Sequence, residues 1–502
     1  MSRVTTHVLP PISNNASSFL IEAATRSYKH QYANIYYLRL QHLKDIVERR
    51  ASNKWKKAAG NAVFVPRVLE VVKAQLSYIV GTVYMEMPLK PNVLRDLARD
   101  RSLPNPAPPP KMCSSEDSIM LEDESGRIVL VGDVIKSAQL VTGVILAALG
   151  METPSGEFEV VDICFAGLAP QTRNQPLTQP TQSDAMEVDS EQTLDRRDDD
   201  PWLAFVSGLD VGAEGGQDAP IELLTGYLTG EMDASHAPVP PSQISRLIIV
   251  GNSLAPYEAA VQPKEVTPTE LRKKKFGNEA STFSNVPGIT LANHLLDIGQ
   301  TLPIHLLPGP NDPAGSIMPQ QPFPRAMFGK VASYATFSCE TNPTFLHLSN
   351  AESRTSDDGS ISCNLLINSG QPLNDMFTYL PSPPVTRLST LESTLRWRHQ
   401  APTAPDTLWC HPYFTSDPFV IKETPNLYVV GGQPRFATKV VRESMEETED
   451  GSERSCRIVM VPTFSRTQEL VLVNMRTMET RTMRFNVEGV GNGVHSVQEA
   501  AL

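Results

Sequence analysis

The sequence predicts a mixed α+β fold with two domains: a small closed β-barrel, and then a larger domain of packed mixed sheets with helices outside. Between about residues 74 and 170, short β-branched runs are interrupted by glycines, which is typical of a small barrel. From residue 201 onward, apolar strand-like runs alternate with helical stretches, which indicates sheets flanked by helices. The 502 residues are enough for two to three domains.

Two segments precede the barrel. Residues 1–25 are expected to form a flexible tail, and residues 26–73 a helical segment whose helix spans about residues 28–56. One face of this helix is apolar, and Arg39 is expected on the other side. We expect the apolar face to pack on the chain's own domain, with docking to a partner as the alternative. The residues that define the apolar face are Tyr36, Leu40, Leu43 and Val47.

The barrel, residues 74–170, suits an oligonucleotide/oligosaccharide-binding (OB) fold. Its one long connection, residues 103–126, is rich in proline and then in acidic residues, so we expect disorder there. An OB barrel that binds single strands presents aromatic side chains beside basic ones. Because few basic residues accompany Tyr78, Tyr84, Phe158 and Phe165, we expect core positions and a barrel used for architecture or protein contacts. The predicted strands are residues 76–84, 127–133, 139–146 and 158–165.

A disordered acidic linker is expected at residues 171–200, because this stretch has too few apolar residues to form a core. The second domain then covers residues 201–502. Two runs near its end, residues 457–462 and 469–473, are expected to add paired strands at a sheet edge. The other predicted strands are residues 202–206, 247–250, 304–307, 364–367 and 427–430, and the predicted helices are 284–298, 375–380 and 389–398.

The composition narrows the functional classes. A formal net charge of -12 argues against broad, non-specific phosphate binding. The one dense basic run, Arg272, Lys273, Lys274 and Lys275, is a solvated loop, a nuclear import signal or a weak DNA contact. The six cysteines lie far apart without a C-x-x-C pair, which favours a reducing compartment. With no apolar stretch long enough to span a bilayer and no secretory signal, we expect an intracellular, soluble protein that does not contact membranes.

Four segments, each an apolar run that ends in Gly, Asn, Asp or Pro, are typical of buried strands opening into loops. They are Phe205–Gly212, Leu247–Asn252, Leu307–Asp312 and Leu427–Pro434. In their order they resemble the metal-ligand motifs D-x-H, G-D, G-N-H-D and G-H-x-H of the calcineurin-like phosphoesterases, and Leu365–Gly370 resembles the segment that carries a further histidine. The positions that correspond to ligands or lie beside them are Gly208, Asp210, Asn252, Pro310, Asn311, Asp312, Ser369, Gly432 and Pro434.

These residues do not provide the ligands of a two-metal site. Such a site needs several carboxylates or imidazoles to hold the cations and to form a nucleophilic hydroxide, and Gly, Pro and Ser cannot supply them. We therefore expect an inactive phosphoesterase domain with no catalytic residues, no metal and no cofactor. His305 and His347 are expected in the core. A rebuilt metal site is the minor alternative; it would use His399, His411, Asp210, Asp312 and Asp406.

The chain as a whole resembles the second (small, B-) subunit family of eukaryotic DNA polymerase delta. The resemblance runs from about residue 28 to 473 and is carried by Val206–Leu209, Ile317–Pro322, Ile367–Gln371, Arg398–Leu408 and Trp409–Tyr413. It implies an OB barrel joined to an inactive calcineurin-like phosphoesterase domain, location in the nucleus, and a role as a non-catalytic scaffold in DNA replication and repair.

The implied partners are the C-terminal cysteine-rich module of the delta catalytic subunit, the third delta subunit and, as a further candidate, the catalytic subunit of polymerase zeta. Two alternatives remain open. One is the corresponding accessory chain of polymerase alpha or epsilon, which the short helical region before the barrel disfavours. The other is an active metal-dependent phosphodiesterase or nuclease, which the lost ligands disfavour.

Overall fold

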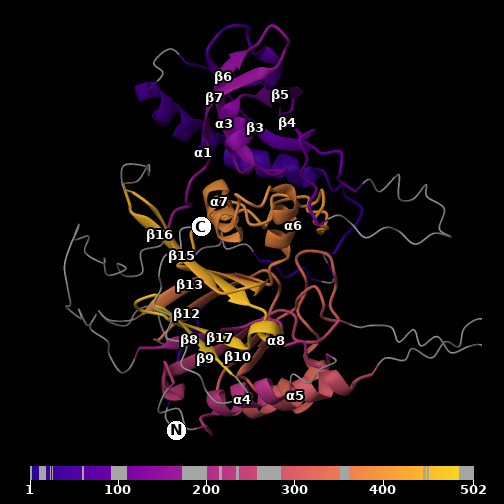
Figure 1. Cartoon of the computed structure of the whole chain (residues 1–502), viewed down its shortest axis with the longest axis vertical. Helices are drawn as coiled ribbons and strands as arrows, with labels where there is room; N and C mark the ends of the chain where they lie inside the picture. The colour runs from indigo at the N-terminus through magenta and orange to yellow at the C-terminus, as the bar shows by residue number, and fades with distance from the viewer. Residues whose placement is uncertain are drawn as a thin grey trace, which may run out of the picture.

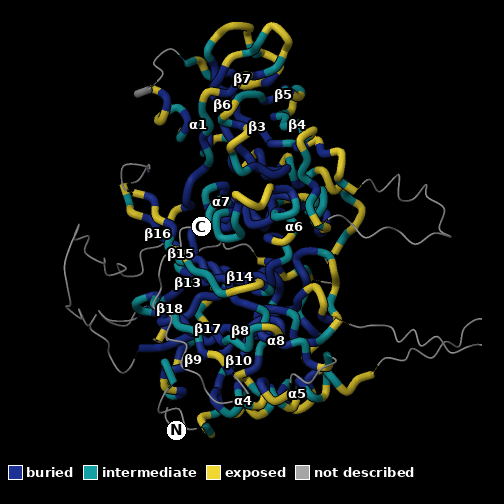
Figure 2. Tube along the Cα trace, in the orientation of Figure 1, coloured by how far each residue is buried: buried dark blue, intermediate teal, exposed yellow. Residues whose placement is uncertain are grey.

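The computed structural model describes residues 3–10, 18–22, 24, 26–58, 62–91, 110–171, 200–213, 218–232, 237–256, 284–350, 361–444, 448 and 451–485. The elements lie in layers along the long axis of the molecule (Figure 1). The barrel and its long helix occupy one end, and two β-sheets stack below it between one pair of helices on the barrel side and another pair at the far end. The strands are mostly buried, whereas exposed residues gather on the outer helices and the barrel loops (Figure 2).

The barrel is a six-stranded sheet in the order β2-β3-β4-β5-β7-β6, closed by antiparallel pairing of β3 with β6. Gly81 of β3 pairs with Leu146 of β6, and a Cβ there would come within 2.7 Å of the carbonyl oxygen of Glu122 in β4. The OB barrel predicted from the sequence is therefore correct in kind. Its elements are β2 (Val63–Phe64), η1 (Val68–Glu70), β3 (Ser77–Glu86), β4 (Ser118–Glu122), β5 (Arg127–Val131), α3 (Asp133–Ser137), β6 (Ile145–Glu152) and β7 (Phe158–Cys164).

Two expectations about the barrel are wrong. The connection predicted to be disordered at residues 103–126 contains β4, which pairs with β3 on one side and β5 on the other; residues 103–109 lie outside the described part. The strand predicted at residues 139–146 begins only at Ile145. Its first apolar residues, Leu140 and Val141, are buried in the core from a loop, so their hydrophobicity reflects packing rather than pairing.

Helix α1 (Asn34–Ala58) packs on the barrel. Its buried face carries Leu40, Leu43, Val47, Ala51 and Trp55 against barrel residues, which agrees with the expected packing on the chain's own domain. Of the four barrel aromatic residues singled out above, Tyr78 and Phe158 are buried, and Tyr84 and Phe165 are partly buried.

The second domain contains two six-stranded sheets, in the orders β1-β12-β13-β14-β16-β15 and β11-β10-β9-β8-β17-β18. Apolar side chains from both sheets form the core between them. The strands are β1 (His7–Val8), β8 (Trp202–Val206), β9 (Ile244–Val250), β10 (Ile304–Leu307), β11 (Phe337–Cys339), β12 (Thr344–Ser349), β13 (Ser362–Asn368), β14 (Leu427–Gln433), β15 (Ala437–Glu443), β16 (Arg454–Pro462), β17 (Glu469–Asn474) and β18 (Thr480–Arg484).

Helices cover both outer faces of the sheet pair (Figure 1). Helix α7 packs on the first sheet next to α6. Helices α4 and α5 cover the second sheet, and their apolar side chains form a hydrophobic core with strands β8, β9 and β10. The helices are α4 (Asp218–Thr229), α5 (Val286–Gly299), α6 (Gln371–Tyr379), α7 (Arg387–Trp397) and α8 (Phe464–Thr467), with 3-10 turns η2 (Pro241–Gln243) and η3 (Arg325–Ser333). Within the described part of the chain, every helix is too short or too polar to span a bilayer.

The sequence led us to expect that the two strands near the C-terminal end pair with each other at a sheet edge. They do not. β16 pairs with β14 and β15 inside the first sheet, and β17 pairs with β8 and β18 inside the second. The prediction was wrong because local apolar runs indicate strands but do not indicate which sheet each strand joins. The C-terminal part of the chain thus completes both sheets.

The N-terminal residues are not a loose tail, which corrects the expectation for residues 1–25 wherever the structure describes them. Strand β1 pairs with β12, and Arg3 donates to the Pro241 carbonyl oxygen at 2.6 Å. The Thr6 hydroxyl accepts a hydrogen bond from Arg246 Nε at 2.8 Å, and Phe19 is buried in a separate core cluster. The N-terminal segment therefore covers the edge of one sheet and satisfies a buried guanidinium.

Deleting residues 1–10 should lower the free energy of unfolding by about 2 kcal/mol, because it removes hydrogen bonds to a buried charged group. Burial already lowers the pKa of Arg246 to about 10, with Glu340 acting in the opposite direction, so this guanidinium is poorly solvated. Urea denaturation of the full-length and shortened chains measures the loss. Thr6→Val, which removes only the hydroxyl, should account for part of it; identical stabilities for all three proteins would contradict this role.

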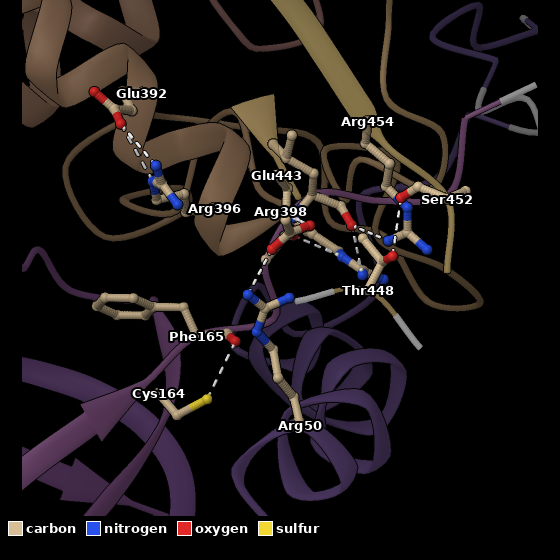
Figure 3. A network of polar contacts seen from close by, with 12 residues as sticks. Arg50, Cys164, Phe165, Glu392, Arg396, Arg398, Glu443, Thr448, Ser452 and Arg454 are labelled. Atoms are coloured by element: carbon tan, nitrogen blue, oxygen red, sulfur yellow. Dashed lines mark hydrogen bonds and ion pairs between the residues drawn. The ribbon is translucent and has the colours of Figure 1, made fainter. Parts of the chain in front are cut away.

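Polar contacts fix the two domains relative to each other (Figure 3). Arg50 of α1 forms an ion pair with the buried Glu443 of β15 at 2.5 Å, and Glu443 also accepts from the Leu168 backbone N–H at 2.9 Å. Arg398 and Arg454 donate to carbonyl oxygens of residues 167–168. The chain leaving the barrel is thereby held against the second domain before the predicted acidic linker starts.

Residues 172–199 of that linker lie outside the described residues. Its two ends are anchored: the Gln171 side chain forms hydrogen bonds with the backbone of Ser455, and Asp200 forms an ion pair with Arg476 at 2.5 Å. The basic run at residues 272–275 is also outside the described part.

Candidate functional site

The strand ends singled out in the sequence meet at one place. β8, β9 and β10 are parallel neighbours, so their carboxyl ends open at the same edge of the second sheet. The Gly208 N–H donates to the Gly251 carbonyl oxygen at 2.9 Å, and the Asp210 N–H donates to that of Asn252 at 3.2 Å. A Cβ on Gly251 would lie 2.5 Å from the Cβ of Ser369, which follows β13 of the other sheet. The site therefore sits across the ends of both sheets.

The two carboxylates of the site serve loop structure. Asp312 is buried and accepts hydrogen bonds from the N–H groups of Leu254 at 2.9 Å and Gly309 at 2.8 Å. Burial raises the pKa of Asp312 to about 7, although the backbone N–H groups act to lower it. Asp210 has a left-handed backbone with φ of 47°, and one of its oxygens accepts from the Ser465 hydroxyl at 2.6 Å.

The neutral positions are also engaged within the chain. Asn252 Oδ1 accepts from the Asn311 N–H at 3.0 Å. The Ser369 hydroxyl lies 2.6 Å from Asn342 Nδ2. The Gly432 N–H donates to the Ser207 hydroxyl at 2.8 Å, and a Cβ on Gly432 would come within 3.0 Å of the Ser369 carbonyl oxygen. Pro310 and Pro434 are exposed at the rim and supply no polar side-chain atom.

A turn near the C-terminal end closes the site, and sequence reasoning missed it. The Phe464 N–H donates to the Ser207 carbonyl oxygen at 2.7 Å, and the Ser465 N–H donates to that of Gly208 at 2.9 Å. A Cβ on Gly208 would meet the Thr463 methyl carbon at 2.6 Å, so the turn occupies the space that a side chain at residue 208 would need. Residues 463–465 carry no metal-ligand residue type, so no motif could have identified them.

Asp312→Ala should destabilise the chain by about 2 kcal/mol, because the N–H groups of Leu254 and Gly309 would lose their buried acceptor. Asp210→Ala removes one side-chain hydrogen bond at a partly buried position and should cost about 1 kcal/mol. Thermal or urea denaturation of the two variants measures both values. A larger loss for Asp210→Ala than for Asp312→Ala would contradict this ranking.

The histidines considered for a rebuilt metal site lie elsewhere. His399 Nε2 is 2.8 Å from Asp417 in the interior, and Asp417 also accepts from Arg39 Nε at 2.9 Å. Burial is the main reason why the pKa of His399 falls to about 4, which leaves the ring neutral at physiological pH. His411 packs edge-on against Tyr28.

The remaining residues of that hypothesis, and the core histidines, also have partners. Asp406 forms an ion pair with Lys90. His305 is buried between Arg246 at 2.9 Å and Glu340 at 2.8 Å, and His347 pairs with Asn364. Among the described residues, no three His, Cys, Asp or Glu side chains are placed to hold a metal ion. The donor set at the strand ends does not fit the two cations that the phosphoesterase fold implies.

The fold and site define a class: an OB barrel followed by a phosphoesterase-like domain of the kind found in polymerase accessory chains. A family model for the DNA polymerase delta subunit OB-fold domain matches residues 31–163, and the family model for the B-subunit of DNA polymerases alpha and epsilon matches residues 203–438. The barrel family therefore includes most of α1, which we had placed before the barrel.

Full-length relatives specify the class further. The chain is 31% identical to the DNA polymerase delta small subunit of Oryza sativa subsp. japonica, over 91% of this chain and 93% of the relative. It is 31% identical to the proteins of the same name from Arabidopsis thaliana, over 91% and 92%, and Saccharomyces cerevisiae, over 94% and 93%. The chain belongs to the DNA polymerase delta small subunit family.

Proposed function

We propose that this chain is a non-catalytic accessory subunit of DNA polymerase delta, acting in the nucleus in DNA replication and repair. The observation that carries the proposal is the state of the strand-end site. Positions that correspond to metal ligands hold residues without ligand atoms, or polar groups that already bond within the chain, and residues 463–465 close over them. A fold of this size without chemistry is best explained by the surfaces that it presents to partners.

The proposed partners are the C-terminal cysteine-rich module of the delta catalytic subunit and the third delta subunit, which this chain would bridge. The catalytic subunit of polymerase zeta is a further candidate partner. The ion pair of Arg50 with Glu443 supports a bridging role, because it makes the barrel and the second domain one platform rather than two tethered units. DNA contact is proposed to be indirect or weak, with Arg272, Lys273, Lys274 and Lys275 as the candidate residues.

The proposal is tested by co-expressing the full chain with the catalytic C-terminal module and the third subunit. We expect a stable ternary complex and a higher soluble yield than for the chain alone. When this chain is left out, the two partners should not associate with each other. The proposal would be contradicted if the purified chain is monodisperse alone and binds neither partner.

The alternative enzymatic function has its own test. Elemental analysis should detect no stoichiometric manganese, iron or zinc, and the protein should not cleave 3′-recessed DNA or a chromogenic phosphodiester with added manganese. Robust hydrolysis that disappears in the Asp210→Ala plus Asp312→Ala double variant would overturn the non-catalytic assignment. That double variant, if folded, should still assemble with both partners.

A further inference from the structure

The strongly exposed aromatic side chains of the described chain come from residues 28–37 and from the loop at residues 409–414. They are Tyr28, Tyr32, Tyr37, Trp409 and Phe414. His30 stacks on Phe414 with ring centroids 4.5 Å apart, and the Asn34 side chain donates to the Phe414 carbonyl oxygen at 3.2 Å. The segment before α1 and its first turns therefore pack beside the loop at residues 409–414. We name the five aromatic residues the aromatic surface.

The backbone of Trp409 is held in place, and its side chain is exposed. The residue is 68% exposed, yet its carbonyl oxygen accepts from the Met318 N–H at 2.8 Å, and the His411 N–H donates to the Met318 carbonyl oxygen at 2.8 Å. A tryptophan held in place by its backbone but left in water loses little entropy on binding and gains a large buried area. Tryptophan and tyrosine are the residues that most often dominate the affinity of protein interfaces.

A cavity of about 250 Å³ adjoins the surface at Tyr37. It lies between the first turns of α1 and the barrel, and besides Tyr37 its lining includes Tyr84 and the three successive acids Glu122, Asp123 and Glu124. The volume is below the usual range for small-molecule sites and suits a single long side chain. The cavity is therefore best suited to a side chain from another polypeptide.

The lining determines the charge of that side chain. Arg127 lies over the Tyr84 ring at 4.6 Å and pairs with Glu122 at 3.0 Å, and Lys90 lies over the same ring at 5.5 Å, so this ring and Glu122 already hold cations of the chain itself. Asp123 is occupied by backbone N–H groups, including that of Val68 at 2.8 Å. Glu124 is exposed and forms no ion pair with any described residue, so its charge is available to a ligand. Aromatic rings beside a carboxylate bind a guanidinium or an ammonium group well.

We propose that the aromatic surface docks a polypeptide segment in which an arginine or lysine is flanked by apolar residues. The basic side chain enters the cavity beside Tyr37 and Glu124, and the apolar neighbours pack on Trp409 and Phe414. This inference rests on the proposed function, because it places one subunit contact of the polymerase complex. It specifies the surface and the chemistry of the docked segment, which the proposed function does not.

The test uses the full chain assembled with the catalytic C-terminal module and the third subunit. p-Benzoylphenylalanine replaces Tyr37 or Trp409 in separate preparations, and the photocrosslinked peptide is identified by mass spectrometry. We expect both positions to crosslink to one partner segment that contains an arginine or lysine. The control position is Ile289 of α5, which is also exposed but lies at the other end of the molecule and should give no such adduct.

Affinity measurements complete the test. Tyr37→Ala and Trp409→Ala should each weaken binding of the crosslinked partner by about 30-fold. Glu124→Lys should weaken it by about tenfold, whereas Glu116→Lys, an equal change of charge at another exposed acid before β4, should not. Because all four side chains are exposed, melting temperatures should stay close to that of the wild type.

The outcomes separate the two proposals. Suppose that the wild type assembles, but the crosslinks reach no partner segment, or reach a second copy of this chain or DNA instead. The docking proposal is then wrong, and the accessory function stands. The docking proposal is equally wrong if Tyr37→Ala, Trp409→Ala and Glu124→Lys all bind like the wild type. If the wild type binds neither partner chain, both proposals fail.

Discussion

Replacing Arg39 by methionine should lower the free energy of unfolding by about 3 to 5 kcal/mol, the cost of leaving one partner of a buried ion pair unpaired. Arg39 and Asp417 are both fully buried, and they are 2.9 Å apart. The Arg39 guanidinium also donates to the carbonyl oxygens of Gly143 at 3.1 Å, Pro402 at 2.6 Å and Ala404 at 2.9 Å. It thereby joins α1, a barrel loop and the loop that follows α7.

The electrostatics of Asp417 explain the size of this effect. Burial alone would raise the pKa of Asp417, but the hydrogen bond with His399 and the charge and hydrogen bond of Arg39 hold it well below its usual value. Without Arg39, the neutral His399 would be the remaining side-chain donor to a carboxylate in the interior. The carboxylate would then be poorly compensated, and unfolding would relieve it.

Urea denaturation of the purified chain measures the effect of Arg39→Met. Lys56→Met is the matched control, because this cation is exposed on the same helix, and it should change stability by less than about 0.5 kcal/mol. Adding Asp417→Asn to Arg39→Met should restore part of the loss, since the buried negative charge is then gone. A loss below about 1 kcal/mol for Arg39→Met would mean that the network contributes little.

Arg39 also shows where sequence reasoning stops. We expected it away from the apolar face of its helix, where a charged residue is normally exposed. Its partner Asp417 is 378 positions away, and no local pattern reports so distant a contact. The same limit explains β1 and β17: each run is local, but β12 and β8, with which they pair, lie far away in the sequence.

The positions of the candidate site could be predicted because their signal is local. Strands β8, β9, β10, β13 and β14 are short apolar runs that end at Gly, Asn, Ser or Pro, and the residue types at those ends report directly on ligand chemistry. The closing turn at residues 463–465 gave no such signal. It fills the site through its backbone and the Thr463 methyl group, and neither depends on a recognisable motif.

Restoring a carboxylate to the site should therefore destabilise the protein rather than create a metal site. Gly208→Asp places a Cβ 2.6 Å from the Thr463 methyl carbon at a backbone φ of 67°. Left-handed backbone costs a non-glycine residue about 1 to 2 kcal/mol, and overpacking a closed interior costs about 1 to 3 kcal/mol more. We expect a total loss of about 2 to 5 kcal/mol in the free energy of unfolding and no stoichiometric manganese after dialysis.

Three further variants separate the causes of this loss. Gly156→Ala measures the backbone cost alone, since its φ is 87° and a Cβ there meets nothing within 4 Å. Gly208→Ala adds the contact with Thr463 but no charge, so its excess over Gly156→Ala measures the closure of the site. Thr463→Ser in the Gly208→Asp background deletes the methyl group and should recover about 1 kcal/mol. If Gly208→Asp instead keeps wild-type stability and binds manganese, the turn at residues 463–465 opens readily. The missing ligand residues alone would then prevent metal binding in the wild type.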